Sequence, residues 1–344
     1  MKDGNPKILI IRLSSIGDIL LTTPFIRQTR RKFPNSKIDF VIKEEFAQLL
    51  DHNTNVNNLI KFNSKGGSYK LGELKKSLVE NHYDYIFDLH NNFRSIYLRQ
   101  GHKKSSVFRI EKNKIKQILY VKFKINNYTQ VTPIAERYLN VGKNAGIIDD
   151  ENGLEIFWDN NTKESVKQIL EKQVINPNDQ VIAIAPGAGF YTKRWPVENY
   201  KKFILNIMEK HHYKVVVLGN ENDKLQGKVL AELENVIDLT GQLSLLQTAV
   251  VLSNSKALIS NDTGLMHMAT AVYTPVLAIF GSTVKEFGFY PYRSKSIVVE
   301  AEGLECRPCS HIGRHTCPKE HFKCMNDITP DIVFENFQRL IIKD

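Results

Sequence analysis

The segment SNDTGLMHMA, at residues 260–269, lies between the apolar runs KALI at 256–259 and VLAIF at 276–280. This pattern predicts a buried strand, a sharp turn and a helix. The Asn, Asp and Thr residues favour the N-cap position of a helix, and the glycine lets a ligand approach the backbone closely. Because the first amides of such a helix point outward and attract phosphate, the segment is a candidate anion site. In an isolated Asp-Thr-Gly, these residues would more often only cap a helix.

Other polar loops follow apolar runs in the same way. They are RLSSIGD at 12–18, APGAG at 185–189 with KRWP at 193–196, LGNE at 218–221, DLTG at 238–241 and FGST at 280–283. Strand and helix patterns alternate along the chain, which predicts an α/β protein with doubly wound parallel sheets. Ligands of such sheets bind beyond the carboxyl ends of the strands, where these loops would lie.

This ordered set of motifs, from about residue 7 to residue 333, resembles the family 9 glycosyltransferases, the ADP-heptose:lipopolysaccharide heptosyltransferases. The resemblance implies a GT-B-like fold, in which two Rossmann-like doubly wound parallel-sheet domains face a central cleft. It also implies an inverting, single-displacement transfer of a heptose from ADP-L-glycero-D-manno-heptose to the inner core of lipopolysaccharide. The partners would be this nucleotide sugar and a lipid-linked oligosaccharide acceptor, with no cofactor.

Length and composition agree with a soluble enzyme of two domains. The chain has 344 residues, of which 42% are hydrophobic and 24% are charged, and a chain of this length usually divides into two cores. No apolar run approaches the ~20 residues needed to cross a bilayer, and the N-terminus lacks the apolar core of a signal peptide. We therefore expect a cytoplasmic protein.

The domain boundary is expected in the polar stretch 149–163. The first domain would cover 1–160 and carry the acceptor side, and the second would cover 161–330 and bind the nucleotide sugar. Residues 331–344 have helical apolar spacing, and the resemblance implies that this helix crosses back to the first domain. No Gly-x-Gly-x-x-Gly follows the first strand, which counts against a dinucleotide-binding dehydrogenase.

The formal net charge of +10 favours acidic partners: nucleic acid, anionic lipid or a phosphorylated small molecule. No zinc-finger or RRM-like signature is present, so nucleic acid is the least supported of these partners. From Arg99 to Lys124 the chain holds nine Lys or Arg residues against a single acid, Glu111, with apolar residues interleaved. This segment is either a solvated face over a core stripe or a contact with the anionic inner membrane surface or a phosphorylated acceptor.

All four cysteines fall within residues 306–324, with three histidines interleaved. The spacing of Cys306 and Cys309 would suit zinc, but Cys317 and Cys324 do not form a second Cys-x-x-Cys. A cytoplasmic chain seldom holds disulfides. Free thiols, a structural metal and disulfides all remain open.

Sugar transfer from a nucleotide donor needs a base for the acceptor hydroxyl and positive charge on the leaving diphosphate. Asp18, on the loop after the first strand, is the candidate base. Its alternative role is to cap the helix expected to begin at Ile19. The resemblance assigns acceptor binding to Ser15, Gly17 and Asp18.

On the donor side, Lys193 follows the glycine-bearing loop of Gly187 and precedes a helix start, so its charge can offset that of the departing diphosphate. The resemblance places a catalytic lysine at this position. Glu221, after a strand, is the candidate for binding ribose hydroxyls, and Asp223 is its alternative.

In the central segment, the amides of Thr263, Gly264 and Leu265 would hold the diphosphate, and Asp262 would face the hydroxyls of the sugar. His267, in the first turn of the helix, would position phosphate or sugar, although a lone helical histidine is more often structural. No carboxylate cluster of the Asp-x-Asp kind is present, so we expect metal independence.

Two other functions share these motifs. The chain could use a different nucleotide sugar to build another surface glycan, or it could bind a nucleotide sugar without turnover. The joint presence of Asp18 and Lys193 counts against the second.

Overall fold

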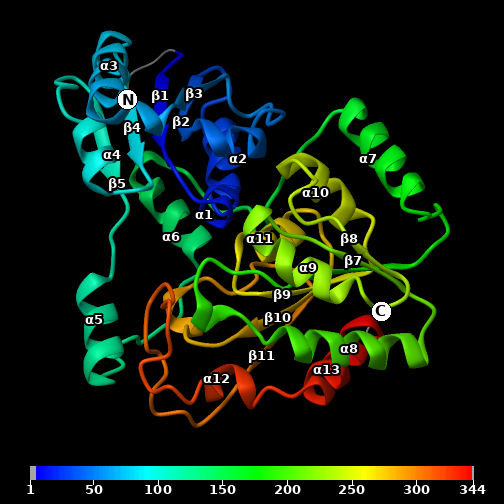
Figure 1. Cartoon of the computed structure of the whole chain (residues 1–344). Coiled ribbons are helices and arrows are strands. Elements are labelled where there is room, and N and C mark those ends of the chain that lie inside the picture. The colour runs from blue at the N-terminus through cyan, green and yellow to red at the C-terminus, as the bar shows by residue number, and fades with distance from the viewer. Residues whose placement is uncertain (1–4, 343–344) are drawn as a thin grey trace. The chain divides into compact units, whose positions relative to one another are not determined.

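The computed structural model describes residues 5–342, which form two compact units (Figure 1). The first unit comprises the chain up to Lys112 together with Pro133–Phe157, and the second comprises Asn113–Thr132 and the chain from Trp158 onward. The break after Phe157 lies close to the expected boundary at 160. The sequence did not predict that 113–132 would belong to the second unit.

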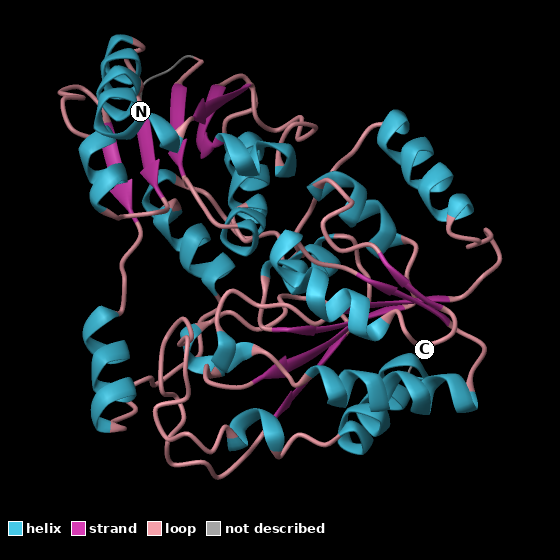
Figure 2. Ribbon diagram, in the orientation of Figure 1, coloured by secondary structure: helices cyan, strands magenta, loops and turns pink. Residues whose placement is uncertain are grey.

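The first unit is built on a parallel sheet of five strands in the order β3-β2-β1-β4-β5. Figure 2 shows strands in magenta and helices in cyan. The central strand β1 is fully buried from Ile8 to Ile11, which explains why it is apolar at each of these positions. The strands are β1 (Lys7–Ile11), β2 (Lys37–Lys43), β3 (Asn58–Phe62), β4 (Tyr85–Asp88) and β5 (Ser106–Arg109).

Helices and single turns connect these strands. The apolar stretch after Ile19 forms two helices rather than the one expected, and the first begins at Ile16 instead of Ile19. Pro24 stands in the first turn of the second helix, where its missing N–H costs nothing. The elements are α1 (Ile16–Leu20), α2 (Thr23–Lys32), η1 (Glu44–Leu49), η2 (Ser64–Gly66), α3 (Gly67–Glu80), α4 (Phe93–Leu98), α6 (Ile134–Val141) and η3 (Lys143–Ala145).

The second unit holds a parallel sheet of six strands in the order β11-β10-β9-β6-β7-β8. Its strands are β6 (Val181–Ala185), β7 (Lys214–Val217), β8 (Val236–Asp238), β9 (Ala257–Asn261), β10 (Val276–Phe280) and β11 (Ser296–Glu300). Its helical elements are α5 (Lys114–Phe123), α7 (Asn160–Lys172), η4 (Tyr191–Lys193), α8 (Val197–Lys210), η5 (Glu221–Asp223), α9 (Lys224–Leu230), α10 (Leu245–Ser253), α11 (Gly264–Ala271), η6 (Lys285–Phe287), α12 (Lys323–Asn326) and α13 (Pro330–Ile342).

The C-terminal helix α13 packs in the core of the second unit. Val333, Phe334, Phe337 and Leu340 are buried in the same cluster as the apolar face of α8. The rings of Phe203 and Phe337 meet edge to face, with centroids 5.7 Å apart. The buried apolar residues of this helix thus pack on α8 and the sheet of the second unit, and its crossing to the first domain stays a prediction.

Each sheet has one point at which the strand order reverses. In the first unit this point lies between β1 and β4, and in the second it lies between β6 and β9. Ligands of such sheets bind at this point, beyond the carboxyl ends of the two flanking strands. Within residues 5–342, no helix is long and apolar enough to cross a membrane.

Candidate functional site

At the reversal point of the first unit, Asp18 forms an ion pair with the arginine that directly follows β1. The distance from Arg12 Nη2 to Asp18 Oδ1 is 2.7 Å. Asp18 Oδ2 accepts hydrogen bonds from the backbone N–H and the hydroxyl of Ser15, at 3.2 and 3.0 Å. Asp18 is thus the third residue of α1, held by the N-cap residue Ser15, and not the cap of a helix that begins at Ile19. Its side chain keeps 19% of its surface exposed, so a ligand can reach it.

Arg12 is fixed by the backbone around it. Its Nε donates to the carbonyl of Ser14 and its Nη1 donates to that of Leu89, both at 2.8 Å. Burial alone would lower the pKa of Arg12, but Asp18, Tyr138 and Asp88 together outweigh this effect and the net pKa is raised. Arg12 is the first residue of the RLSSIGD motif, but the sequence pattern did not predict a role for it. Its position directly after a fully apolar strand was the available signal, because a buried cation needs a partner.

Tyr138 on α6 and His90 after β4 complete this group. Burial raises the pKa of Tyr138, which also forms a side-chain hydrogen bond with Asp18. The Leu13 N–H donates to His90 Nδ1 at 3.1 Å. Burial, with Arg12 and other nearby cations, lowers the pKa of His90 to about 3, so its ring is neutral at physiological pH. We call Arg12, Ser15, Asp18, His90 and Tyr138 the first-unit site.

The other two residues of the expected acceptor group differ in exposure. Ser15 is exposed, and Gly17 is buried as the second residue of α1. Ser15 can therefore meet a ligand beside Asp18, whereas Gly17 serves the packing of the short helix.

At the reversal point of the second unit, Lys193 pairs with Asp262. Lys193 Nζ lies 2.6 Å from Asp262 Oδ2, and the Thr283 hydroxyl donates to the same oxygen at 2.8 Å. The Asp262 side chain is only 8% exposed. We expected Asp262 to face a ligand. In the structure, one of its carboxylate oxygens instead holds the lysine ammonium at the start of α11, a contact that spacing alone did not reveal.

Asn261 ties the loop of Lys193 to the segment that begins α11. Its Oδ1 accepts from the Trp195 N–H at 3.1 Å, and its Nδ2 donates to the Pro186 carbonyl at 2.8 Å. Thr263 is the N-cap residue of α11, and no side chain caps this helix. Thr263, Gly264 and Leu265 are half-buried, whereas His267 is only 3% exposed. The first amides of α11 therefore lie beside the lysine, as an anion site requires.

We name Gly187, Lys193, Glu221, Asp262 and Thr263–Leu265 the second-unit site. A Cβ on Gly187 would overlap the carboxylate of Asp223, so this loop must have a glycine there. Asp223 is buried and accepts from the Asn220 N–H at 2.9 Å. Asp223 is thus committed to the loop, whereas Glu221, in η5 beyond the end of β7, is 68% exposed and pairs with Lys224 at 2.7 Å. Glu221 remains the acid that a ligand can reach.

The four cysteines are free thiols in the structure. Cys306 Sγ lies 3.9 Å from His321 Nε2. Burial raises the pKa of Cys309 and raises that of Cys324 to about 12, which keeps both protonated. In the part of the chain from 5 to 342, no group of three or more His, Cys, Asp or Glu residues is placed to hold a metal ion.

Two Rossmann-like parallel-sheet units, each with polar side chains gathered at its reversal point, form a fold of the GT-B type. The chain belongs to glycosyltransferase family 9 (heptosyltransferase), whose sequence model matches residues 71–320. The expected family and fold are thus confirmed, and the protein is a glycosyltransferase.

Individual relatives agree over nearly the whole chain. Lipooligosaccharide heptosyltransferase 2 of Haemophilus influenzae is 26% identical, with 98% of this chain and 99% of the relative covered. The crystal structure of a family 9 glycosyltransferase from Veillonella parvula matches with a TM-score of 0.82 at 23% identity, covering 100% of this chain and 99% of that one. The ADP-heptose lipopolysaccharide heptosyltransferase II of Escherichia coli matches with a TM-score of 0.73 at 24% identity, covering 98% and 99%.

Proposed function

We propose that this enzyme transfers a heptose from ADP-L-glycero-D-manno-heptose to the inner core of lipopolysaccharide. The names of the Haemophilus and Escherichia relatives support the heptose, the lipid-linked acceptor and, for the latter, the ADP-linked donor. The observation that carries the proposal is the Lys193–Asp262 pair at the start of α11. A cation beside free helix amides is the arrangement that binds and stabilises a departing diphosphate.

On the donor side, Lys193 contacts the diphosphate together with the amides of Thr263 to Leu265. Asp262 acts mainly by orienting Lys193, since Thr283 and Lys193 share one of its oxygens. Glu221 hydrogen-bonds the ribose hydroxyls from its exposed position. The lysine and the helix amides neutralise the charge that grows on ADP, so the reaction proceeds without a metal ion.

On the acceptor side, Asp18 removes the proton from the acceptor hydroxyl while that oxygen attacks the anomeric carbon of the heptose. The bond from this carbon to the diphosphate breaks in the same step, ADP leaves, and the configuration inverts. Arg12 keeps the Asp18 carboxylate ionised and oriented, because an adjacent cation favours the charged form of an acid. Ser15 adds a second anchor to the same carboxylate.

The test is transfer by the purified protein with ADP-heptose and a lipid A acceptor that carries the inner-core sugars. Release of ADP and a product heavier by one heptose are expected, and a chelator should leave the rate unchanged. The matched donors are UDP and GDP sugars, and the melting temperature should rise with ADP but not with UDP or GDP. Turnover of a UDP or GDP sugar in place of ADP-heptose would assign the enzyme to another surface glycan.

The acceptor is lipid-linked, so we also propose peripheral contact of this cytoplasmic enzyme with the inner face of the cytoplasmic membrane. The net charge of +10 and the basic segment Arg99–Lys124 support this contact. Not all of the segment is available, because Arg99 pairs with the buried Asp88 at 2.9 Å. The part from Asn113 onward belongs to the second unit.

A further inference from the structure

We infer that one face of α5 inserts its apolar side chains into the interfacial layer of an anionic bilayer and anchors the second unit there. This inference rests on the proposed function, since a lipid-linked acceptor requires the enzyme to work at a membrane. It goes further in naming the element, the side chains and the physical form of the contact. We call Ile115, Ile118 and Phe123 the anchor residues.

The anchor residues are more exposed than a helix of a globular unit normally allows. Ile115 is 75% exposed, Ile118 is 50% exposed and Phe123 is 63% exposed, while Ile125, just beyond the helix, is 49% exposed. None of the ten residues of α5 is buried. A surface helix usually buries its apolar stripe against a core, so the stripe of α5 is available for another surface.

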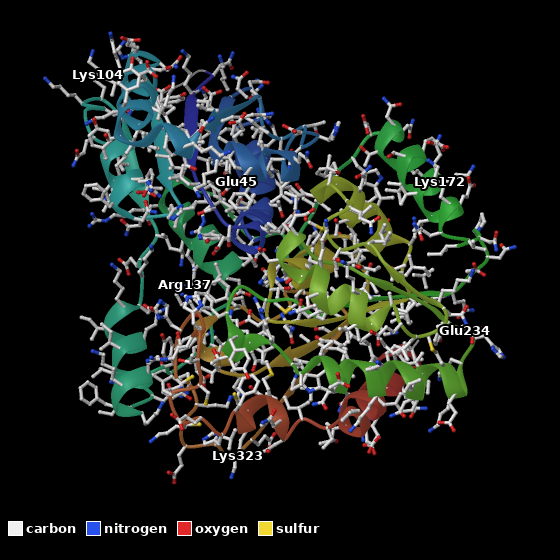
Figure 3. The ribbon with its side chains drawn as sticks, in the orientation of Figure 1. Glu45, Lys104, Arg137, Lys172, Glu234 and Lys323 are labelled. Carbon is white, nitrogen blue, oxygen red and sulfur yellow. The ribbon has the colours of Figure 1, made fainter. Side chains whose placement is uncertain are left out.

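The opposite face of α5 is firmly held by its own unit. The rings of Tyr120 and Tyr128 pack edge to face on Phe287, at centroid distances of 6.2 and 6.3 Å. Lys124 Nζ donates to the carbonyls of Cys306 and Pro308, at 3.0 and 2.7 Å. Figure 1 shows α5 beside the orange loops that follow β10 and β11, and Figure 3 shows side chains of α5 that project away from these loops.

Helical geometry separates the two faces. At ~100° per residue, Ile115 and Ile118 lie about 60° apart on one side of the helix, whereas Phe123 lies about 80° from Ile115 and about 140° from Ile118. Tyr120, which contacts Phe287, lies about 140° from Ile115 and about 160° from Ile118, so these two isoleucines face away from the held side. Phe123 lies only about 60° from Tyr120 and therefore borders the held side. Because the side of α5 that contacts Phe287 is fixed, the anchor residues are held in place on the exposed side of the helix.

The positive charge around α5 indicates that the surface bound by the anchor residues is an anionic membrane. From 112 to 132 the chain carries lysines at 112, 114, 116, 122 and 124 and no acid. The Lys124 ammonium is already bound by the carbonyls of Cys306 and Pro308, and Lys112 belongs to the first unit, so the charge of α5 itself comes from Lys114, Lys116 and Lys122. On the exposed side of α5 these lysines lie among the anchor residues, and exposed helices that combine lysines with large apolar side chains are typical of helices lying in the plane of an anionic membrane. Each lysine near the surface adds roughly fivefold to such binding. A second copy of this chain, docked through the same face, would set lysines against lysines, and like charges oppose such an interface.

The experiment measures cosedimentation of the full chain with vesicles of phosphatidylcholine containing about a quarter phosphatidylglycerol. The anchor variant carries Ile115→Ser, Ile118→Ser and Phe123→Ser. The matched control carries Leu205→Ser, Leu225→Ser and Ile332→Ser, which are also exposed apolar residues of the second unit.

We expect the anchor variant to bind vesicles at least about tenfold more weakly than the parent, since partial burial of three large apolar side chains is worth a factor of that order or more. The control variant should bind like the parent, and both should keep the parental melting temperature. A charge variant with Lys112→Ser, Lys114→Ser and Lys116→Ser should lose binding mainly at low salt, because exposed charges are screened.

Phe123→Trp gives a direct readout of depth. Its fluorescence should shift to the blue with anionic vesicles and be quenched by brominated lipid. No blue shift, equal binding by the anchor variant and the parent, or equal loss in the control variant would each overturn the inference. Complete release of the parent protein from the vesicles at high salt would also overturn the inference, because the contact would then be purely electrostatic.

A separate assay distinguishes this inference from the proposed function. Transfer to a lipid-free fragment of the acceptor needs no membrane, and vesicle binding needs no donor. If transfer is normal and the anchor variant still binds vesicles, only the inference fails. If vesicle binding depends on the anchor residues but no heptose is transferred, only the proposed function fails.

Discussion

Replacing Asp18 by Asn separates a catalytic role of this carboxylate from a structural one. Asn is almost the same size and can still accept hydrogen bonds from Ser15, but it cannot pair with Arg12 as an ion or take a proton. Transfer should fall by the ~10²–10⁴-fold typical of a lost general base. The affinity for ADP, whose proposed contacts lie in the second unit, should not change.

The loss in the free energy of unfolding caused by Asp18→Asn can be estimated from the structure. The Arg12 and Asp18 side chains are only 11% and 19% exposed, and their ionic hydrogen bond is 2.7 Å long. Losing one charge-assisted hydrogen bond costs about 1.5–3 kcal/mol. Arg12 keeps its bonds to two backbone carbonyls, so we expect a loss of about 2 kcal/mol in the free energy of unfolding, within that range.

Asp150 provides the matched control. It pairs with Arg27 at 2.8 Å in the same unit, and the two side chains are 7% and 20% exposed. Asp150→Asn should therefore lose a similar free energy of unfolding and leave transfer unchanged. Urea unfolding, ADP binding and steady-state transfer are measured for both variants beside the parent. Transfer by the Asp18 variant within a few-fold of the Asp150 variant would remove Asp18 from the mechanism.

Three further outcomes are expected. Lys193→Ala should lower ADP affinity and turnover by a factor of ten or more, as a lost charge-assisted contact predicts, whereas Lys214→Ala, which breaks another ion pair of the same unit, should leave calorimetric ADP binding intact. Gly187→Ala should lower both the melting temperature and the ADP affinity, because its Cβ would overlap the Asp223 carboxylate. In the control Gly189→Ala, the added Cβ meets nothing within 4 Å, so neither quantity should change. Equal effects of the two substitutions would contradict this prediction. Burial lowers the pKa of His90 to about 3, against about 6.5 in the unfolded chain. Its contribution to stability is therefore complete above about pH 6.5 and is lost as the pH falls toward 3. When the free energy of urea unfolding is measured over this pH range, the His90→Asn variant should lose less stability on acidification than the parent does. If both proteins lose the same free energy of unfolding, the stabilising role of neutral His90 is refuted.

Much of the fold could be predicted because buried parallel strands leave a strong signal. The runs at 7–11, 181–184 and 276–280 are apolar at nearly every position, and all three form interior strands of their sheets. The helix after Ile19 was predicted less well, because a capping box at Ser15 and a proline at an early position divide it in two. For helix α13, the apolar spacing shows that one face is buried but not which unit buries it.

The sequence predicted which loops carry the candidate site residues, but not which side chains contact one another. That Lys193 and the start of α11 would lie together follows from the loops that flank a reversal point. The Asp262 carboxylate that holds Lys193, the Arg12 guanidinium beside Asp18 and the role of Thr283 are pairings between residues distant in sequence. No local pattern encodes such pairings, and only the packing of the sheets brings them together.

The assignment of 113–132 to the second unit means that the chain passes between the units three times, after Lys112, after Thr132 and after Phe157. A single cut after Phe157 therefore does not yield two complete halves. The N-terminal fragment would carry α5 without Phe287 to pack on, and the C-terminal fragment would lack Tyr120 and Tyr128. A hybrid enzyme that takes its donor half from one parent and its acceptor half from another must accordingly exchange two separate stretches of gene. One crossover cannot recombine these halves.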